Sequence, residues 1–516
     1  MKLARTKNAL NNAKWGILNK CIFLLFPFII RAILIRTLGI EYLGLSSLFT
    51  SVLSILNLAE LGIGNAIVFS MYKPIAENDE ETICALMNLY RKLYRYISGI
   101  VLTVGLILIP FLPKLIHGEV PPDINLYVLY AIYLSNAVIS YWLFAYRSSI
   151  LYAHQRNDVV SKVQLLTHLL LYIFQIIALL LTKNYYTYII LTPICGVVTN
   201  ILNALFSKKI YPQYYCKGMI NEEKRNDIVK RIKGMLILKI SYASRNAFDS
   251  IVISSMLGLT AVAIYNNYYY LSTAVSGFLL VIMTSISAGI GNSLETESTT
   301  KNKSDLNKIT FAYMTLAGFC FCCFLSLYQP FISLWVGEKL LFADQTMVII
   351  ALYFLIDKSE NVIGQYYDAA GLWWYGKWKG ILETIVNLSL NIILCKFWGI
   401  TGIVFATMAT IIVISIPLSY HYLYKYSFNQ GCIQELLSHY FRLLCFGMMG
   451  IAPYFVTRMI PFGNSTFERI LLLLIRLIIG VVLGAVVYLF MFSQTSIYRQ
   501  TKEWLLSKLI VHRNHS

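Results

Sequence analysis

Long apolar runs, separated by short polar segments, follow one another along the whole chain. Many of these runs reach about 20 residues, the length that a helix needs to cross the hydrocarbon of a bilayer. The runs are continuous rather than alternating, so they favour helices over the strands of a β-barrel. The pattern predicts an all-α polytopic membrane protein with about 14 transmembrane helices.

Length and flanking polarity place the predicted spans. The first six cover residues 14–38, 42–72, 89–112, 124–150, 161–182 and 186–207, and the next six cover 234–257, 261–292, 309–334, 346–370, 378–396 and 399–424. The last two cover 437–457 and 467–492. We therefore expect an N-terminal lobe at 1–207, a cytoplasmic connector at 208–233, a C-terminal lobe at 234–424, and two extra helices with a cytoplasmic tail at 425–516.

Two short sequence patterns recur in the two predicted lobes. The segment "LGIEYLG" (38–44) follows the first span, and "LGLTAVA" (257–263) follows the seventh. The segment "GIGN" occurs at the end of the second span (62–65) and again at the end of the eighth (289–292). The shared order predicts two six-helix lobes in a pseudo-two-fold arrangement.

The chain is strongly basic, with 43 Lys and Arg against 25 Asp and Glu and a net charge of +18. If both termini are cytoplasmic, most of the basic residues fall in the inner segments, as the positive-inside rule requires. Topology therefore explains the charge, and no nucleic-acid partner is needed. Most of the 10 cysteines lie in apolar runs without metal-ligand spacing, which is typical of small core residues.

Several function classes lack their motifs in this sequence. We find no phosphate-binding Walker loop, no dinucleotide-binding glycine pattern and no HExxH zinc motif. The outer loops are short, whereas a membrane enzyme that polymerises or ligates glycans is expected to carry a large one. The remaining classes are a transporter without its own ATPase and a membrane scaffold.

The stretch "PFIIRAILIRTLG" (27–39) places two arginines inside the first span. Arg36 lies near the outer end and can reach the interface, whereas Arg31 lies roughly 12 Å deep. A charge near the bilayer centre costs about 2.5–3.5 kcal/mol or more, so Arg31 needs a partner or a function. Asp249 on the seventh span has a similar predicted depth and is the expected partner. Pro27 is expected to bend the helix next to Arg31.

Other polar residues form stripes at helical spacing on several spans. One polar face on a helix predicts either the lining of a water-filled cavity or polar contacts between packed helices. We favour a cavity because the stripes recur in both lobes. The residues are Gln164, His168, Tyr172 and Gln175 on span five, Lys239, Arg245 and Asp249 on span seven, Asp357, Asn361, Gln365 and Asp368 on span ten, and Glu383, Asn387 and Asn391 on span eleven.

The segment "RAILIRTLGIEYLGLSSLFTSVLSILNLAELGIGNAI" (31–67), with the repeat and the predicted layout, resembles the Wzx-type polysaccharide flippases. These belong to the MOP superfamily, which also contains lipid II flippases and MATE drug exporters. The resemblance implies a flippase that moves an undecaprenyl-diphosphate-linked oligosaccharide repeat unit from the inner to the outer leaflet by alternating access. It places the protein in the bacterial cytoplasmic membrane, with both termini in the cytoplasm, in the synthesis of O-antigen, capsule or exopolysaccharide.

The resemblance also implies roles for individual residues and partners. Arg31 matches the first-span arginine thought to meet the diphosphate. The other expected cavity residues are Lys239, Arg245, Asp249, Asp357, Lys358 and Glu360, and the expected inner-gate or ion-coupling residues are Glu60, Asp368 and Glu383. The expected partners are the lipid-linked oligosaccharide, membrane lipids, a polysaccharide polymerase and its chain-length machinery. No cofactor is expected, and coupling to H⁺ or Na⁺ stays open.

Three alternatives remain at this stage. Export of a small cationic drug, as in the MATE branch, would make Asp249 or Asp357 the substrate or ion site. A membrane enzyme of glycan assembly is disfavoured by the short outer loops and the missing acid pairs. A scaffold without transport is disfavoured by the polar stripes.

Overall fold

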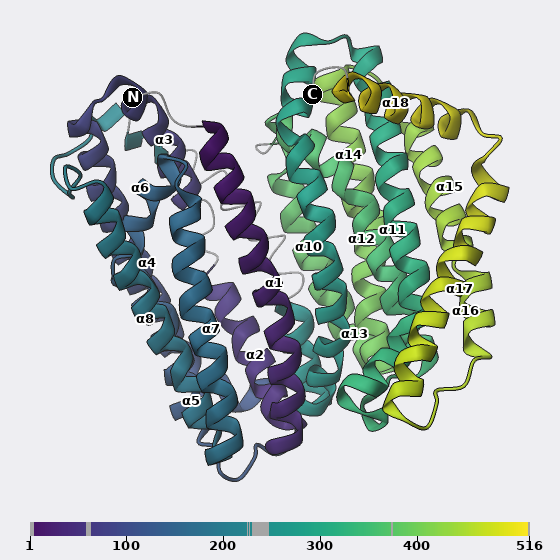
Figure 1. Ribbon diagram of the computed structural model, residues 1–516, viewed down its shortest axis with the longest axis horizontal. Coiled ribbons are helices and arrows are strands. Elements are labelled where there is room, and N and C mark those ends of the chain that lie inside the picture. Colours follow the sequence, from purple (N-terminus) through teal and green to yellow (C-terminus); the bar gives the residue numbers. More distant parts are fainter. Residues whose placement is uncertain are drawn as a thin grey trace. The chain divides into compact units, whose positions relative to one another are not determined.

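A computed structural model describes residues 5–57, 63–223, 225–226, 228–229, 247–372 and 375–513 of the chain. Every regular element in this part is a helix (Figure 1). The chain divides into two compact units, Met1–Ala263 (the N-terminal unit) and Ile264–Ser516 (the C-terminal unit). The predicted all-α, multi-span membrane fold is confirmed.

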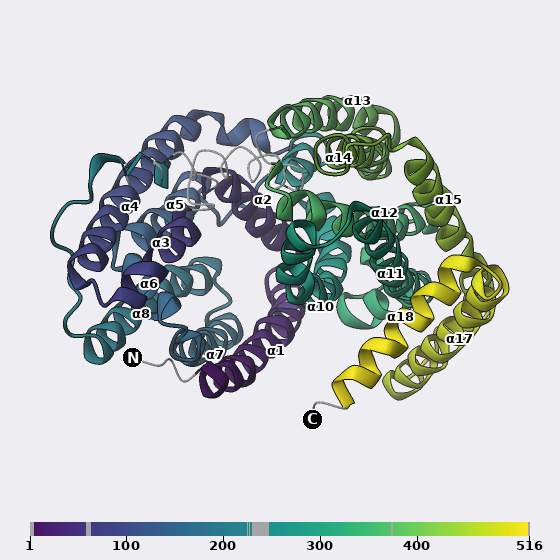
Figure 2. The same ribbon diagram turned by 90° about the horizontal axis from the view of Figure 1, so that it is seen from above.

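The N-terminal unit is built around the packing of α1 on α7 and of α7 on α8 (Figure 2). Its helices are α1 (Arg5–Thr37), α2 (Ile40–Leu56), α3 (Ile63–Glu77), α4 (Glu80–Leu108), η2 (Ile109–Leu115), α5 (Leu126–Trp142), η3 (Ala145–Arg147), α6 (Ser148–Ala153), α7 (Asn157–Thr182) and α8 (Tyr185–Ile210). A further apolar helix, Ala247–Leu257, follows. The first predicted span therefore lies beside the fifth, and the fifth lies beside the sixth.

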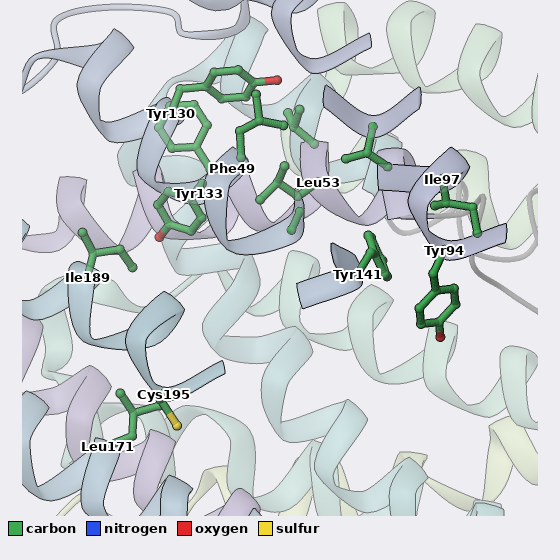
Figure 3. Packing of buried hydrophobic residues seen from close by; sticks show 14 of the residues in the cluster. Phe49, Leu53, Tyr94, Ile97, Tyr130, Tyr133, Tyr141, Leu171, Ile189 and Cys195 are labelled. Atoms are coloured by element: carbon green, nitrogen blue, oxygen red, sulfur yellow. The ribbon is translucent and has the colours of Figure 1, made fainter. Parts of the chain in front are cut away.

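The core of this unit contains aromatic side chains that also carry hydroxyl groups (Figure 3). The Phe49 ring lies 5.7 Å from the ring of Tyr130 and 5.4 Å from that of Tyr133. The Tyr130 hydroxyl donates to the Gly105 carbonyl at 3.0 Å, and the hydroxyls of Tyr133 and Tyr185 are 3.2 Å apart. Buried hydroxyls need such partners because water is absent from the bilayer core.

The two repeat glycines have the same backbone role. Gly39 precedes α2 with φ 125°, and Gly258 precedes α10 (Leu259–Thr296) with φ 89°. Positive φ is costly for residues with a Cβ, so glycine allows the sharp turn between consecutive helices at both places. A Cβ on Gly44 would lie 2.3 Å from the Leu259 carbonyl oxygen, so the start of α10 packs tightly on α2. The repeat of 38–44 at 257–263 is thus a repeat of local structure at these two glycines.

The C-terminal unit contains the rest of α10 and the helices that follow it in the chain. They are α11 (Thr299–Val336), η4 (Glu338–Leu340), α12 (Asp344–Ala369), α13 (Lys377–Thr410), η6 (Ile411–Ser415), α14 (Ile416–Leu423), η7 (Tyr424–Phe428), α15 (Ile433–Met449), α16 (Ile451–Arg458), α17 (Thr466–Phe492) and α18 (Ser496–Arg513). α12 packs between α11 and α13, and α18 crosses the end of α11 (Figure 1).

The apolar stretch Trp378–Phe428 is 51 residues long, or about 77 Å as a straight helix. This is far longer than the hydrocarbon core, which is about 30 Å thick. Gly399 breaks the stretch with a non-helical backbone, φ 56° and ψ −135°. The break falls at the predicted boundary between the eleventh and twelfth spans.

Nine helices of the described residues are long and apolar enough to cross a membrane, or ten if the bent pair Leu126–Trp142 and Ala145–Ala153 forms one span. The 51-residue stretch counts once in that number. The 26-residue helix α12 is not included, and it carries Asp357, Lys358 and Glu360 in its middle. The layout of fourteen spans and the domain limits stay predictions.

Candidate functional site

The structure places the predicted site residues in both units. Arg31 lies on α1, Asp249 on the helix Ala247–Leu257, and Glu383 on α13, while α12 carries Asp357, Lys358, Glu360 and Asp368. Glu60, Lys239 and Arg245 lie outside the described residues. Asp368 is exposed near the end of α12.

Arg31 lies on α1, in the N-terminal unit. It is partly buried, six residues before the end of α1, and so about 9 Å from that end compared with the expected 12 Å. It interacts electrostatically with the Tyr188 hydroxyl on α8. The Tyr188 ring lies 5.7 Å from that of Tyr185, whose hydroxyl meets the Tyr133 hydroxyl. A guanidinium and several hydroxyl groups suit phosphate and sugar oxygens.

The polar stripe of the fifth span is a contact face between helices. Gln164 on α7 accepts from the Asn19 amide on α1 at 3.1 Å, and the His168 ring lies 4.3 Å from the ring of Phe23. Gln175 is 4% exposed and donates to Thr192 on α8 at 3.2 Å. For these residues the contacts support helix packing rather than cavity lining.

Asp249 is 1% exposed and lies in the same unit as Arg31. A buried carboxylate requires charge or hydrogen-bond partners, and Asp249 has an interaction of this kind. The predicted pairing with Arg31 stays a prediction.

A network of opposite charges links α12 to α13 and α14 in the C-terminal unit. Lys379 Nζ on α13 lies 3.1 Å from Glu360 Oε1 on α12 and 3.5 Å from Glu383 Oε1 on its own helix. It also donates to the Ser419 hydroxyl of α14 at 2.6 Å. The Ser415 hydroxyl donates to the Glu360 carboxylate. The side chains of Glu360, Lys379 and Glu383 are all at least 85% buried. We call these three residues, together with Ser415 and Ser419, the lysine network.

Charged and polar neighbours on α12 extend the lysine network. Asp357 pairs with Lys358 at 2.6 Å, and the Lys358 ammonium lies 5.7 Å from the Phe354 ring centre. Next to Glu360, the Ser359 hydroxyl lies 3.3 Å from Nε2 of His439 on α15. The predicted cavity residues Asp357, Lys358 and Glu360 therefore form ion pairs within the C-terminal unit.

The other two polar residues of the stripe on the eleventh span, Asn387 and Asn391, are buried. Asn387 and Asn391 are 2% and 0% exposed, and the Asn387 amide donates to Thr407 at 3.0 Å. These residues connect the two halves of the long apolar stretch on either side of Gly399.

Sequence reasoning missed Lys379, the residue at the centre of the lysine network. Its pairing with Glu383 has the i,i+4 spacing of helical ion pairs, so this half of the contact was visible in "KGILE" (379–383). Its contact with Glu360, 19 residues away on another helix, required the fold.

An apolar cavity of about 580 Å³ lies between α10, α11, α17 and α18. Its lining includes Ile282, Met283, Phe311, Leu316, Tyr488 and Leu505. The volume and the apolar walls are of the kind that holds hydrocarbon chains. Within the described residues, no group of three or more His, Cys, Asp or Glu could hold a metal ion.

Comparison with solved structures identifies the class of fold. An inward closed form of the lipid II flippase MurJ matches with a TM-score of 0.63 and 15% identity, over 93% of this chain and 98% of that one. An inward-facing multidrug resistance MATE family transporter of the MOP superfamily matches with a TM-score of 0.58 and 13% identity, over 82% and 95%. The MATE transporter VcmN of Vibrio cholerae matches with a TM-score of 0.56 and 13% identity, over 83% and 98%. The chain thus has the same fold as these three membrane proteins.

The sequence comparison assigns the family within this class. The family described as "Polysaccharide biosynthesis protein" matches residues 9–288, which is more than half of the chain. The protein belongs to this family of polysaccharide biosynthesis proteins. A comparison with curated proteins gives no match.

Proposed function

We propose that the protein flips an undecaprenyl-diphosphate-linked oligosaccharide repeat unit from the inner to the outer leaflet of a bacterial cytoplasmic membrane. The family match carries this proposal, because it covers residues 9–288 and so includes Arg31 and Tyr188. A bare diphosphate cannot enter hydrocarbon, and a guanidinium can hold it through two parallel hydrogen bonds. The product would be a building block of O-antigen, capsule or exopolysaccharide.

The proposal includes the finer architecture expected from the sequence. Two six-helix lobes and two extra helices would alternate between inward and outward access, with both termini in the cytoplasm. The apolar cavity between α10, α11, α17 and α18 supports a lipid-linked substrate, because it offers a dry surface to a prenyl chain. A polymerase and its chain-length machinery would take the repeat unit on the outer side.

Export of a cationic drug is less well supported by the contacts. That function needs an acidic residue that binds the cation. Asp357 is held by Lys358 at 2.6 Å, and Glu360 and Glu383 are held by Lys379. These carboxylates already have cations within the protein.

Deletion of the gene, followed by analysis of lipid-linked intermediates, tests the proposal. Complete but unpolymerised repeat units should accumulate with their sugars facing the cytoplasm, protected from a membrane-impermeant glycosidase or from periodate in spheroplasts. A polymerase deletion strain is the matched control, because there the same intermediates should be exposed on the outer side. Intermediates that become accessible at the parental rate in the deletion strain would contradict a flippase function.

A further inference from the structure

A second cavity, of about 390 Å³, lies in the C-terminal unit between α11, α12, α16 and α17. Much of its lining is apolar, but Asp344, Arg458 and Arg476 also line it. Arg458 pairs with the Asp344 carboxylate. None of its lining residues belongs to the lysine network.

Arg476 is the unusual residue of this cavity because it is 4% exposed on a membrane-spanning helix. Its Nη2 donates to the carbonyls of Ile460 and Pro461, and its guanidinium lies 5.1 Å from the Phe462 ring centre. In the described part of the chain, no acceptor meets Arg476 Nε and no carboxylate pairs with the guanidinium. Two arginines thus share the cavity with one carboxylate.

The packing of α17 directs Arg476 into the protein. Gly480 and Gly484 follow it at intervals of four residues, and a Cβ on Gly480 would lie 2.6 Å from the Ser326 hydroxyl of α11. The opposite face of α17 exposes Leu474 and Ile478, which are 53% and 62% exposed, as expected beside lipid. Capping of the carbonyls after α16 uses only one nitrogen of the guanidinium. The other nitrogens of this buried guanidinium still need an acceptor, and an anion would supply both hydrogen bonds and an opposite charge.

We propose that this cavity binds a phosphate group, supplied by the headgroup of a membrane lipid or by free phosphate. The guanidinium fork of Arg476 matches two phosphate oxygens, and Arg458 adds a second positive charge at the rim. The apolar walls and the lipid-exposed face of α17 favour a headgroup whose acyl chains stay in the bilayer. In the predicted orientation the cavity lies at the outer leaflet.

Native mass spectrometry of the purified full chain in a non-ionic detergent tests this site. The probes are phosphatidylglycerol, the matching diacylglycerol without phosphate, and inorganic phosphate. We expect phosphatidylglycerol to bind to the parent protein. Arg476→Gln should lower the affinity for this lipid roughly tenfold. Arg469→Gln is the matched control, because it removes one charge from the same helix at a surface pair with Glu338.

Ala343→Leu keeps Arg476 but narrows the cavity, so it tests the site even if Arg476→Gln folds poorly. Loss of phosphatidylglycerol in either variant, with little binding of diacylglycerol, supports a lipid headgroup. Loss of inorganic phosphate in the same variants supports a site that also takes the free ion. Parental binding of both phosphate probes in both variants would overturn the proposal, as would equal binding of diacylglycerol and phosphatidylglycerol by the parent.

Discussion

The polar interior of the N-terminal unit differs from that of the C-terminal unit in its chemistry. Around α1, α7 and α8, most polar contacts join amides, hydroxyls and aromatic rings, and Arg31 acts electrostatically on Tyr188. Opposite charges pair at the start of α7, where Asp158 meets Arg156 and Lys162. Around α12, α13 and α14, the contacts join opposite charges, with one lysine held by two glutamates. The second arrangement is expected to stabilise its own helices and to repel an anion, whereas the first presents a positive group with neutral hydrogen-bonding neighbours.

Lys379→Met gives the strongest test of the stabilising role. It leaves two buried carboxylates without their ammonium, which should lower the free energy of unfolding by about 3–5 kcal/mol. Thermal unfolding of the purified protein in detergent, followed by tryptophan fluorescence, measures the change. Addition of Glu360→Gln and Glu383→Gln to the same chain should restore much of the loss.

Lys301→Met is the matched control for that experiment. Lys301 pairs with Glu297 at 2.5 Å, but both side chains are about half exposed, so its removal should cost less than about 1 kcal/mol. If Lys379→Met unfolds like the parent yet abolishes glycan export, the lysine network acts in transport and the contrast between the units is lost.

Arg31→Ala tests whether the positive group of the N-terminal unit serves transport. We expect the protein to insert normally and glycan export to fall roughly 10- to 100-fold, because charge-assisted hydrogen bonds to the diphosphate are lost. Arg31→Lys should keep part of the activity. Surface polysaccharide in a complemented deletion strain, normalised to protein level, is the readout. Arg36→Ala, on the same helix, should export normally, and equal losses in both variants would deny Arg31 a special role.

Asp249→Asn asks whether a buried carboxylate belongs to the transport cycle of the N-terminal unit. The change removes a charge without altering size, and we expect export to fall about fivefold, or about 1 kcal/mol, with a shifted pH profile. Export measured from pH 6 to pH 8 provides the test. Asp305→Asn, which loses a pair with Lys308 on α11, is the control. If Asp249→Asn exports at the parental rate and with the parental pH profile, Asp249 has a structural role and none in transport.

The sequence predicts the helices well because apolar runs of membrane length leave the backbone few alternatives. Gly39, Gly258 and Gly399 mark turns between helices, and each has the positive φ that glycine tolerates. Of the predicted span 42–72, the described residues contain the helices Ile40–Leu56 and Ile63–Glu77.

The partners of the polar residues could be predicted only within one helix. Periodicity identified the stripe of α7, but it could not tell that α1 and α8 cover it rather than water. In the same way, the i,i+4 pair Lys379–Glu383 was visible, whereas Glu360 and Ser419 approach Lys379 from helices whose positions depend on tertiary packing.

The smallest effect concerns a neutral histidine at the edge of the N-terminal unit. The His154 ring lies 4.2 Å from that of Tyr211, and its Nδ1 lies 3.0 Å from the Ile150 carbonyl oxygen. Burial lowers the pKa of His154 below its ordinary value of 6.5, although the hydrogen bond to Ile150 opposes this shift. The unfolded chain therefore binds a proton more readily, so the stability linked to this group is complete above pH 6.5 and falls as the pH drops through the lower folded pKa.

His154→Phe keeps an aromatic ring beside Tyr211 but cannot take up a proton. Thermal unfolding from pH 7.5 to pH 5 should therefore depend less steeply on pH in this variant than in the parent. The exposed His421 on α14 offers a control, and His421→Phe should leave the slope unchanged. A steeper slope for His154→Phe than for the parent would mean that the protonated ring is stabilised in the folded state. In that case the N-terminal unit would hold a further buried charge besides that of Asp158, and the contrast between the two units would weaken.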